Sequence, residues 1–194
     1  LHLSIRRQRQ MCIRDRWMDV RSFGQVFAFK GSDLSLGIRG PVSVQPAFSV
    51  DPIDITSMQI TKSVNSEDKE GKSSDTMGMK HRVDFGVYIL KGSINVQLSE
   101  KTGFTEEDAE KIKEAIRTLF VNDSSSARPD GSMVMHKLYW WKHNCKIGQY
   151  SSHKVHNSIE IKKKEGVRNP RKIEDYEIIC HELPGLAVEE YEGL

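Results

Sequence analysis

The chain has 194 residues, 37% hydrophobic residues and a formal net charge of +2, which suits one domain with its own hydrophobic core. A mean hydropathy of -0.53 and the lack of an apolar run near ~20 residues exclude a membrane-spanning helical protein. The three cysteines have no metal-ligand spacing, which is typical of reduced thiols and predicts a cytoplasmic protein.

Residues 1–16 differ from the rest of the chain. They hold five arginines and one aspartate without a periodic pattern, and Met11–Arg16 looks like a translated sequencing adapter. We expect a non-native segment here, and the alternative is a natural basic arm that binds nucleic acid. Without it, 24 basic and 26 acidic residues remain, a net charge of −2. The overall pI is therefore no evidence for nucleic-acid binding.

The first half of the remaining chain predicts strands and one long hairpin. Residues 17–30 are expected to form a turn followed by a strand. Residues 38–50 alternate between apolar and polar side chains but contain Pro41 and Pro46, which indicates an edge or bulged strand. Residues 51–82 have alternating arms and a polar tip, which predicts a protruding β-hairpin.

The second half predicts strands around a single helix. Residues 83–98 give the strongest strand pattern, and the helix is expected over 105–120 with Thr105 as its N-cap and Leu119 on its buried face. Further strands are expected at 133–141, 154–163 and 176–180. The order predicts an α+β fold: a ferredoxin-like or RRM-like domain over 17–194 that lacks its first strand and helix, with the hairpin inserted at about 51–82.

The sequence holds no common catalytic or metal-binding motif. His153 and His156 could face one metal on a helix, but on the predicted strand they would point to opposite faces. The acidic residues cluster at the helix start and in the tail, where they enclose no pocket. We therefore expect a protein that is not an enzyme and needs no metal or cofactor.

Arg39 is the leading candidate for binding. It stands between Gly37 and Gly40, where a guanidinium can donate several hydrogen bonds to a phosphate while the glycines let another backbone come close. The alternative is a turn arginine that pairs with Asp33 or Asp51. The residue types alone leave both interpretations open.

The base of the predicted hairpin adds a second group of candidates. Basic side chains on its two arms could flank a strand of RNA, and the methionines beside them could wedge between bases or simply cap a small core. These residues are Lys62, Met77, Met79, Lys80, His81 and Arg82.

Charge is unevenly distributed along the chain. Residues 131–164 hold seven lysines and one acid, whereas residues 173–194 hold seven acids and no lysine or arginine. This suggests two surfaces with different partners, and the alternative is two ordinary solvated faces.

Seven blocks in order resemble the backbone subunit of the subtype I-C CRISPR surveillance complex, Cascade. They are DVRSFG at 19–24, IRGPV at 38–42, SVDPI at 49–53, TMGMKH at 76–81, EKTGFTEEDAE at 100–110, DSSSAR at 123–128 and HKVHNSIEI at 153–161. The family begins with a strand, a glycine- and asparagine-rich motif and a helix that have no counterpart here, so the resemblance implies an N-terminally truncated member.

The resemblance implies an RRM-like palm with a thumb hairpin, polymerised along CRISPR RNA. Each thumb displaces one base of the guide, and the segments between pair with target DNA. The implied partners are CRISPR RNA, target DNA through the guide, copies of the same chain and other Cascade subunits, with no membrane.

The family's binding residues transfer only where blocks match. Arg39, Gly37 and Gly40 match the palm motif. Lys62, Lys80 and His81 match thumb-base positions, with Lys62 where a family arginine is common. The other candidates for RNA binding are Arg21, Met77, Arg82, His153 and Lys154.

Two rival functions stay open. Related subunits of other CRISPR types cut RNA with an aspartate between palm and thumb, for which Asp75 and Asp84 are the candidates here. The second rival is a stand-alone RNA-binding module.

Overall fold

A computed structural model describes residues 16–28, 35–61 and 77–194. The segment 1–16, predicted to be non-native, lies outside these residues except for Arg16, and the tip of the predicted hairpin lies outside them as well. The chain divides into two compact units. Unit 1 comprises residues 1–45, 91–158 and 180–194, and unit 2 comprises residues 46–90 and 159–179.

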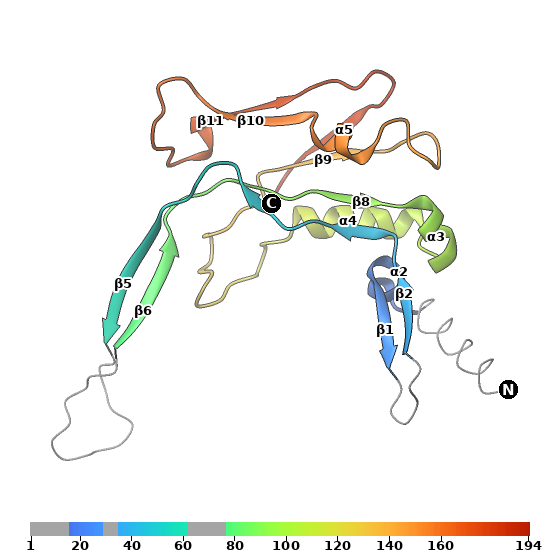
Figure 1. Cartoon of the computed structure of the whole chain (residues 1–194), viewed down its shortest axis with the longest axis horizontal. Coiled ribbons are helices and arrows are strands. Elements are labelled where there is room, and N and C mark those ends of the chain that lie inside the picture. The colour runs from blue at the N-terminus through green and yellow to red at the C-terminus, as the bar shows by residue number, and fades with distance from the viewer. Residues whose placement is uncertain (1–15, 29–34, 62–76) are drawn as a thin grey trace, which may run out of the picture. The chain divides into compact units, whose positions relative to one another are not determined.

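The class is α+β, as predicted (Figure 1). The described strands form six two-stranded antiparallel sheets, which pair β1 with β2, β3 with β8, β4 with β7, β5 with β6, β9 with β12 and β10 with β11. Short pairs of this kind gain their stability from packing against other elements, because an isolated two-stranded ribbon is marginal in water.

Unit 1 begins with helix α2 (Met18–Phe23), which leads directly into β1 (Gly24–Ala28). β1 pairs with β2 (Ser35–Arg39), and β3 (Val42–Val44) pairs with β8 (Gly92–Ile94). Helix α3 (Val96–Thr102) contacts α2. The strand predicted within 17–30 is therefore present as β1, and the turn predicted before it is helix α2.

Helix α4 (Glu106–Arg117) confirms the strongest helix prediction. The Thr105 side chain accepts from the Asp108 N–H, and the Asp108 carboxylate accepts from the Thr105 N–H, which closes a capping box. Ile112 is buried, but Leu119 is exposed because the helix ends before it. Among the described residues of unit 1, the buried apolar side chains include Pro41, Phe104, Ile112, Val155 and Leu186.

The rest of unit 1 contains β9 (Lys137–Trp141), helix α5 (Ser152–His156) and β12 (Val188–Glu192). β9 contacts α4 and pairs with β12, whose register sets Val188 opposite Trp141. The predicted strand at 133–141 is therefore shorter than expected, and β12 was not predicted at all.

Two strand predictions were wrong over part of their length. The expected strand 83–98 breaks after Val83 and reappears as β7 (Tyr88–Ile89) and β8, and it ends at Asn95. The Asn95 side chain accepts from the Leu98 N–H and caps α3, which a left-handed Gly103 then closes. The expected strand 154–163 begins as helix α5, because Ser151 caps it through the Lys154 N–H.

Unit 2 holds three strand pairs. β4 (Phe48–Ser49) pairs with β7, and β5 (Ile55–Thr61) pairs with β6 (Met77–Val83). β10 (Ile159–Lys163) pairs with β11 (Tyr176–Cys180), and the short 3-10 helix η1 (Ile173–Asp175) directly precedes β11. The antiparallel pairing of β5 with β6 confirms the predicted hairpin. Tyr176 is buried; its ring lies 6.5 Å from that of Phe85, and its hydroxyl donates to Asp51.

Among the residues described, no helix is both long and apolar enough to cross a membrane.

Candidate nucleic-acid interface

Arg39 ends β2 in unit 1 and lines an open concavity. The register places Gly24 opposite Arg39 and Val26 opposite Gly37. Directly opposed residues of an antiparallel pair share one face, so all four lie on the same face of the β1–β2 hairpin. Phe23, Gln25 and Ile38 complete the lining, and Phe23 and Val26 are exposed. A cation therefore lies beside apolar side chains and bare backbone.

Gly37 and Gly40, on either side of Arg39, have different steric surroundings. A Cβ on Gly37 would meet nothing within 4 Å, so the backbone there stays open to a partner. A Cβ on Gly40 would lie 2.1 Å from the Ser22 carbonyl oxygen. Gly40 therefore permits the close approach that the sequence predicts, but the backbone it meets is that of α2.

The Arg39 side chain makes no hydrogen bond or ion pair within the described residues. Of the two partners considered from the sequence, Asp33 lies outside these residues. Asp51 accepts from the Tyr176 hydroxyl at 2.8 Å and lies 3.2 Å from the Lys163 ammonium. The interpretation as a turn arginine paired with Asp51 therefore gains no support, and the phosphate contact stays a prediction.

Arg21 occupies a different setting. Its guanidinium donates to both carboxylate oxygens of Asp108, and the Asp108 side chain is only 2% exposed. The Arg21 hydrogen bonds are the main cause that holds the pKa of Asp108 down at about 2. The pair joins α2 to the first turn of α4, which favours a role in folding for Arg21 over a contact with RNA.

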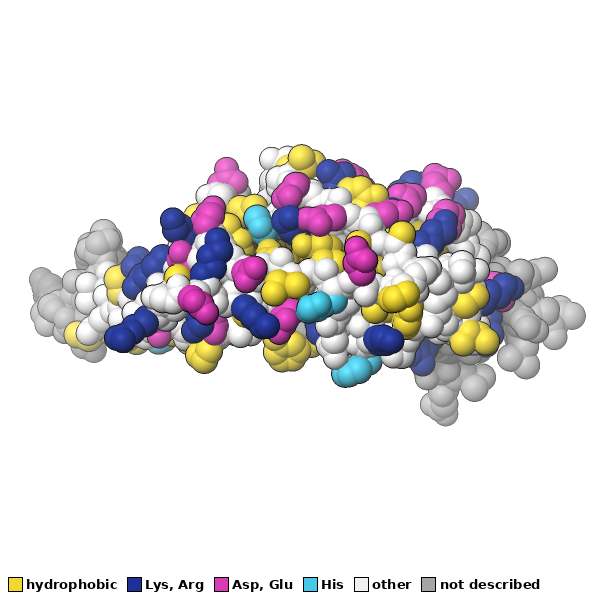
Figure 2. Space-filling model, turned by 90° about the horizontal axis from the view of Figure 1, so that it is seen from above, with side chains coloured by type: hydrophobic (Ala, Val, Ile, Leu, Met, Phe, Trp, Pro, Cys, Tyr) yellow, Lys and Arg dark blue, Asp and Glu magenta, His cyan; other side chains and the backbone are white. Residues whose placement is uncertain are grey.

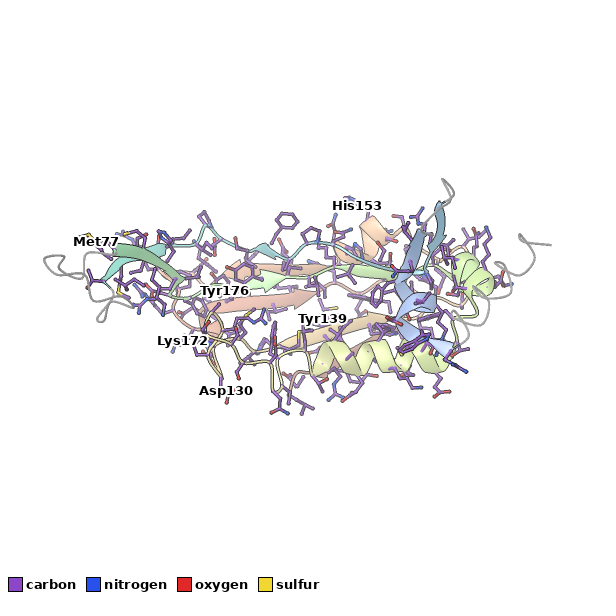
Figure 3. All side chains as sticks on the ribbon, turned by 90° about the horizontal axis from the view of Figure 1, so that it is seen from below. Met77, Asp130, Tyr139, His153, Lys172 and Tyr176 are labelled. Carbon is purple, nitrogen blue, oxygen red and sulfur yellow. The ribbon has the colours of Figure 1, made fainter. Side chains whose placement is uncertain are left out.

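The β5–β6 ribbon divides its candidate residues between two faces. Ser57 lies opposite His81 and Gln59 opposite Met79, whereas Met58 lies opposite Lys80 and Thr56 opposite Arg82. Side chains alternate along a strand, so one face carries His81, Met77 and Met79 and the other carries Lys80 and Arg82. Met77 lies in the pair farthest along the ribbon from Val83 (Figure 3). Lys62 lies outside the described residues.

Both faces of the ribbon are open to solvent. Every residue of β6 is exposed, and in β5 only Thr56 is partly covered. The large apolar side chains include Met58 and Met79, which are 41% and 57% exposed. A ribbon with apolar side chains on both faces and no layer over either is typical of a segment that binds a partner.

Polar contacts on each ribbon face are local. The Ser57 hydroxyl and a His81 ring nitrogen are 2.8 Å apart. On the other face Asp84 accepts from Thr56 at 2.6 Å and from Arg82 at 2.8 Å. The Thr56 hydrogen bond, with a smaller contribution from the Arg82 charge, lowers the pKa of the Asp84 carboxyl. Lys80 makes no such contact in the described part of the chain.

His153 and Lys154 lie on helix α5, not on a strand. A His153 ring nitrogen is 3.0 Å from the Asn157 amide nitrogen, and the Lys154 ammonium lies 4.5 Å from the centre of the Tyr150 ring. A His156 ring nitrogen is 3.0 Å from the Gly92 carbonyl oxygen. In residues 16–28, 35–61 and 77–194, no three His, Cys, Asp or Glu side chains gather as a metal site would require.

Most lysines of the basic run, and some acids of the acidic run, form ion pairs. Glu189 of β12 lies 2.9 Å from the Lys113 ammonium, and Glu190 pairs with Lys137. Of the seven lysines in 131–164, five form ion pairs with acids: Lys137, Lys142, Lys146, Lys162 and Lys163. The lysine run is therefore not a free basic surface. Of the seven acids in 173–194, three form ion pairs within the described residues: Glu189, Glu190 and Glu192.

Sequence reasoning missed one basic group. Lys164, Arg168, Arg171 and Lys172 lie in the segment between β10 and β11 and are exposed. In the view of Figure 2, Lys and Arg side chains gather towards the left of the molecule, with acidic side chains among them. The available signal was the run Arg-Asn-Pro-Arg-Lys at 168–172, which contains no acid.

A family model described as CRISPR-associated protein Cas7 matches residues 4–181. No curated protein matches the chain.

Proposed function

We propose a function from one premise: the chain belongs to the CRISPR-associated Cas7 family. We propose that it is a backbone subunit of a subtype I-C Cascade complex that binds CRISPR RNA through its phosphates and does not cut nucleic acid. The seven sequence blocks favour subtype I-C, and the family supplies the association with CRISPR.

The observation that supports this proposal most is the setting of Arg39. Its guanidinium has no partner in the described residues, and it lies beside the bare backbone of Gly37. A guanidinium in such a place can bind a phosphate through two parallel hydrogen bonds, and a phosphate carries no sequence information. A subunit that must hold any guide needs this kind of contact.

The exposed β5–β6 ribbon supports the second part of the proposal. We propose that it is the thumb, and that it orders against RNA and against a neighbouring copy of the chain. Target DNA would then be held through base pairing with the guide, and other Cascade subunits would complete the assembly.

Binding to RNA oligomers of equal length and unrelated sequence tests the proposal. The full chain should bind them with equal affinity, and binding should weaken as salt rises. Size analysis at increasing RNA length separates the backbone subunit from a stand-alone module. Mass that grows in steps with RNA length supports the backbone, whereas one chain per RNA at every length supports the module.

The enzymatic alternative rests on Asp84 and Asp75. Both carboxylate oxygens of Asp84 already accept hydrogen bonds, from Thr56 and Arg82, and Asp75 lies outside the described residues. We expect the complex of this chain with RNA to leave labelled RNA intact in magnesium. Cleavage that Asp84→Asn or Asp75→Asn abolishes would establish the nuclease instead.

A further inference from the structure

The segment 164–172, here named the basic loop, runs from the end of β10 to the start of η1 in unit 2. It contains Lys164, Arg168, Arg171 and Lys172, all exposed. None of these four side chains forms an ion pair in the part of the chain that the structure describes. This distinguishes the loop from the preceding lysine run, in which five of seven lysines are paired.

The loop also contains one acid, Glu165, which forms no ion pair within the described residues. Asp175, which follows the loop, is used by the backbone. The Asp175 carboxylate accepts from the Arg171 N–H at 2.8 Å and from the Lys172 N–H at 3.2 Å. The Lys164 N–H donates to the Asp175 carbonyl oxygen at 2.9 Å. Asp175 therefore ties the two ends of the loop together and makes no ion pair with its cations.

The ends of β10 and β11 that adjoin the basic loop are also held in place. Tyr176 is buried and donates to Asp51, which also lies 3.2 Å from the Lys163 ammonium. Lys172 and Tyr176 lie at this end of the hairpin (Figure 3). Cations on a fixed loop lose less conformational freedom on binding than cations on a flexible tail.

One cation of the loop acts on a carboxylate that directly follows β6. The charge of Arg171 acts on Asp84, the same carboxylate that accepts from Arg82. Arg82 and Lys80 lie on one ribbon face, as the register shows. The loop cation Arg171 therefore lies near enough to Asp84, at the base of the ribbon, for its charge to contribute to lowering the pKa of that carboxyl.

We propose that the basic loop binds the phosphodiester backbone of a nucleic-acid strand, through Arg168, Arg171 and Lys172, as a phosphate contact in addition to that of Arg39. Three cations within five residues, with no acid between them, offer positive charge to several phosphates and carry no base-reading geometry. The inference rests on the proposed function, since it supposes that nucleic acid is the ligand. The strand could be the guide RNA or a DNA strand, because both offer the same phosphates.

A charge-removal experiment tests the loop directly. The triple variant Arg168→Gln/Arg171→Gln/Lys172→Gln is compared with the unaltered full chain on a single-stranded RNA and a DNA of the same sequence, from low to high salt. The slope of the logarithm of the binding constant against that of salt should fall in magnitude by about 2, since each phosphate contact on a single strand contributes about 0.7. The loss should be equal on RNA and DNA.

A matched control removes the same charge elsewhere. Lys111→Gln/Lys142→Gln/Lys146→Gln also lowers the net charge by three, but these lysines are committed to ion pairs with Glu107, Glu106 and Glu100. Its slope should match that of the unaltered chain, and an equal fall would overturn the inference, because net charge would then explain the effect. If the triple variant melts at a lower temperature, the exposed single variant Arg168→Gln replaces it, with an expected fall of about 0.7.

The remaining outcomes separate the two proposals. An unchanged salt slope in a triple variant that still binds RNA would contradict phosphate binding by the basic loop and would leave the proposed function standing. A loss on RNA alone would overturn the assignment to phosphates. An unaltered chain that binds neither strand would overturn both proposals.

Discussion

Arg21 and Asp108 meet at two points, with Nε 2.7 Å from Oδ2 and a terminal guanidinium nitrogen 2.6 Å from Oδ1. The same carboxylate caps helix α4 by accepting from the Thr105 N–H. One side chain therefore fixes both the start of α4 and the position of α2 against it. Removing either partner would leave a charge with little access to water.

We expect Asp108→Asn to lower the free energy of unfolding by about 3 kcal/mol at neutral pH, because the guanidinium loses its partner in a largely buried place. Urea unfolding measures this change. The exposed pair of Glu107 with Lys111 provides the control, since Glu107→Gln should cost less than about 1 kcal/mol. Equal losses in the two variants would contradict a special role for Asp108.

The pH dependence of stability gives a second measure of the same pair. The pKa of Asp108 is lowered to about 2 in the folded chain from 3.8. The pair's contribution is therefore complete above about pH 4 and is lost as pH falls towards 2, a loss of about 2 kcal/mol. We expect unfolding curves from pH 5 to pH 2 to show this loss in the unaltered chain and not in Asp108→Asn.

Arg39→Ala should weaken RNA binding without weakening the fold. Its side chain has no partner in the described residues, so the melting temperature should stay unchanged. Affinity should fall equally for RNA of every sequence, and the salt slope should decrease by about 0.7. Arg39→Lys should keep the slope and lose affinity, because an ammonium cannot form the two parallel hydrogen bonds. A lower melting temperature with an unchanged slope would favour a structural arginine.

The two faces of the β5–β6 ribbon should respond differently to mutation. Met77→Ala/Met79→Ala removes exposed apolar side chains and should lower RNA affinity about fivefold, or about 1 kcal/mol, without changing the salt slope. Lys80→Gln on the other face should lower the slope. Filter binding over a salt series distinguishes the two. Identical effects would mean that the faces do not contact RNA separately.

The elements that sequence predicted well have local causes. Helix α4 carries its own cap at Thr105 and its acids in the first turn, and the β5–β6 hairpin carries alternating arms. The start of α3 was missed because residues 83–98 alternate like a strand, although the Asn95 side chain that caps α3 accepts from an N–H only three residues further on.

The candidate site was harder to predict because its residues depend on distant partners. Arg21 looked like Arg39 in sequence, yet its partner Asp108 is 87 residues away. Glu189 belonged to an acidic run, but it pairs with Lys113, 76 residues away. The register that separates His81 from Lys80 also comes from pairing between strands. A charge run shows what a surface could offer, and only the fold shows which charges are already used.

Gly37 and Gly40 provide a matched pair for the last prediction. A Cβ at position 40 would lie 2.1 Å from the Ser22 carbonyl oxygen and 2.5 Å from the Phe23 carbonyl carbon. Both are backbone atoms that cannot turn aside, so α2 would have to move. We expect Gly40→Ala to destabilise unit 1 by about 3 kcal/mol, as overpacking of a core does. Thermal melting would show this loss.

Gly37→Ala should act in the opposite way. Its Cβ would meet nothing within 4 Å, so the melting temperature should stay the same. The methyl group would nevertheless project from the open backbone beside Arg39, where the proposed phosphate approaches. We therefore expect weaker RNA binding with an unchanged salt slope, because no charge is lost. Full RNA affinity in Gly37→Ala would show that the phosphate contact does not lie on this face of the β1–β2 hairpin.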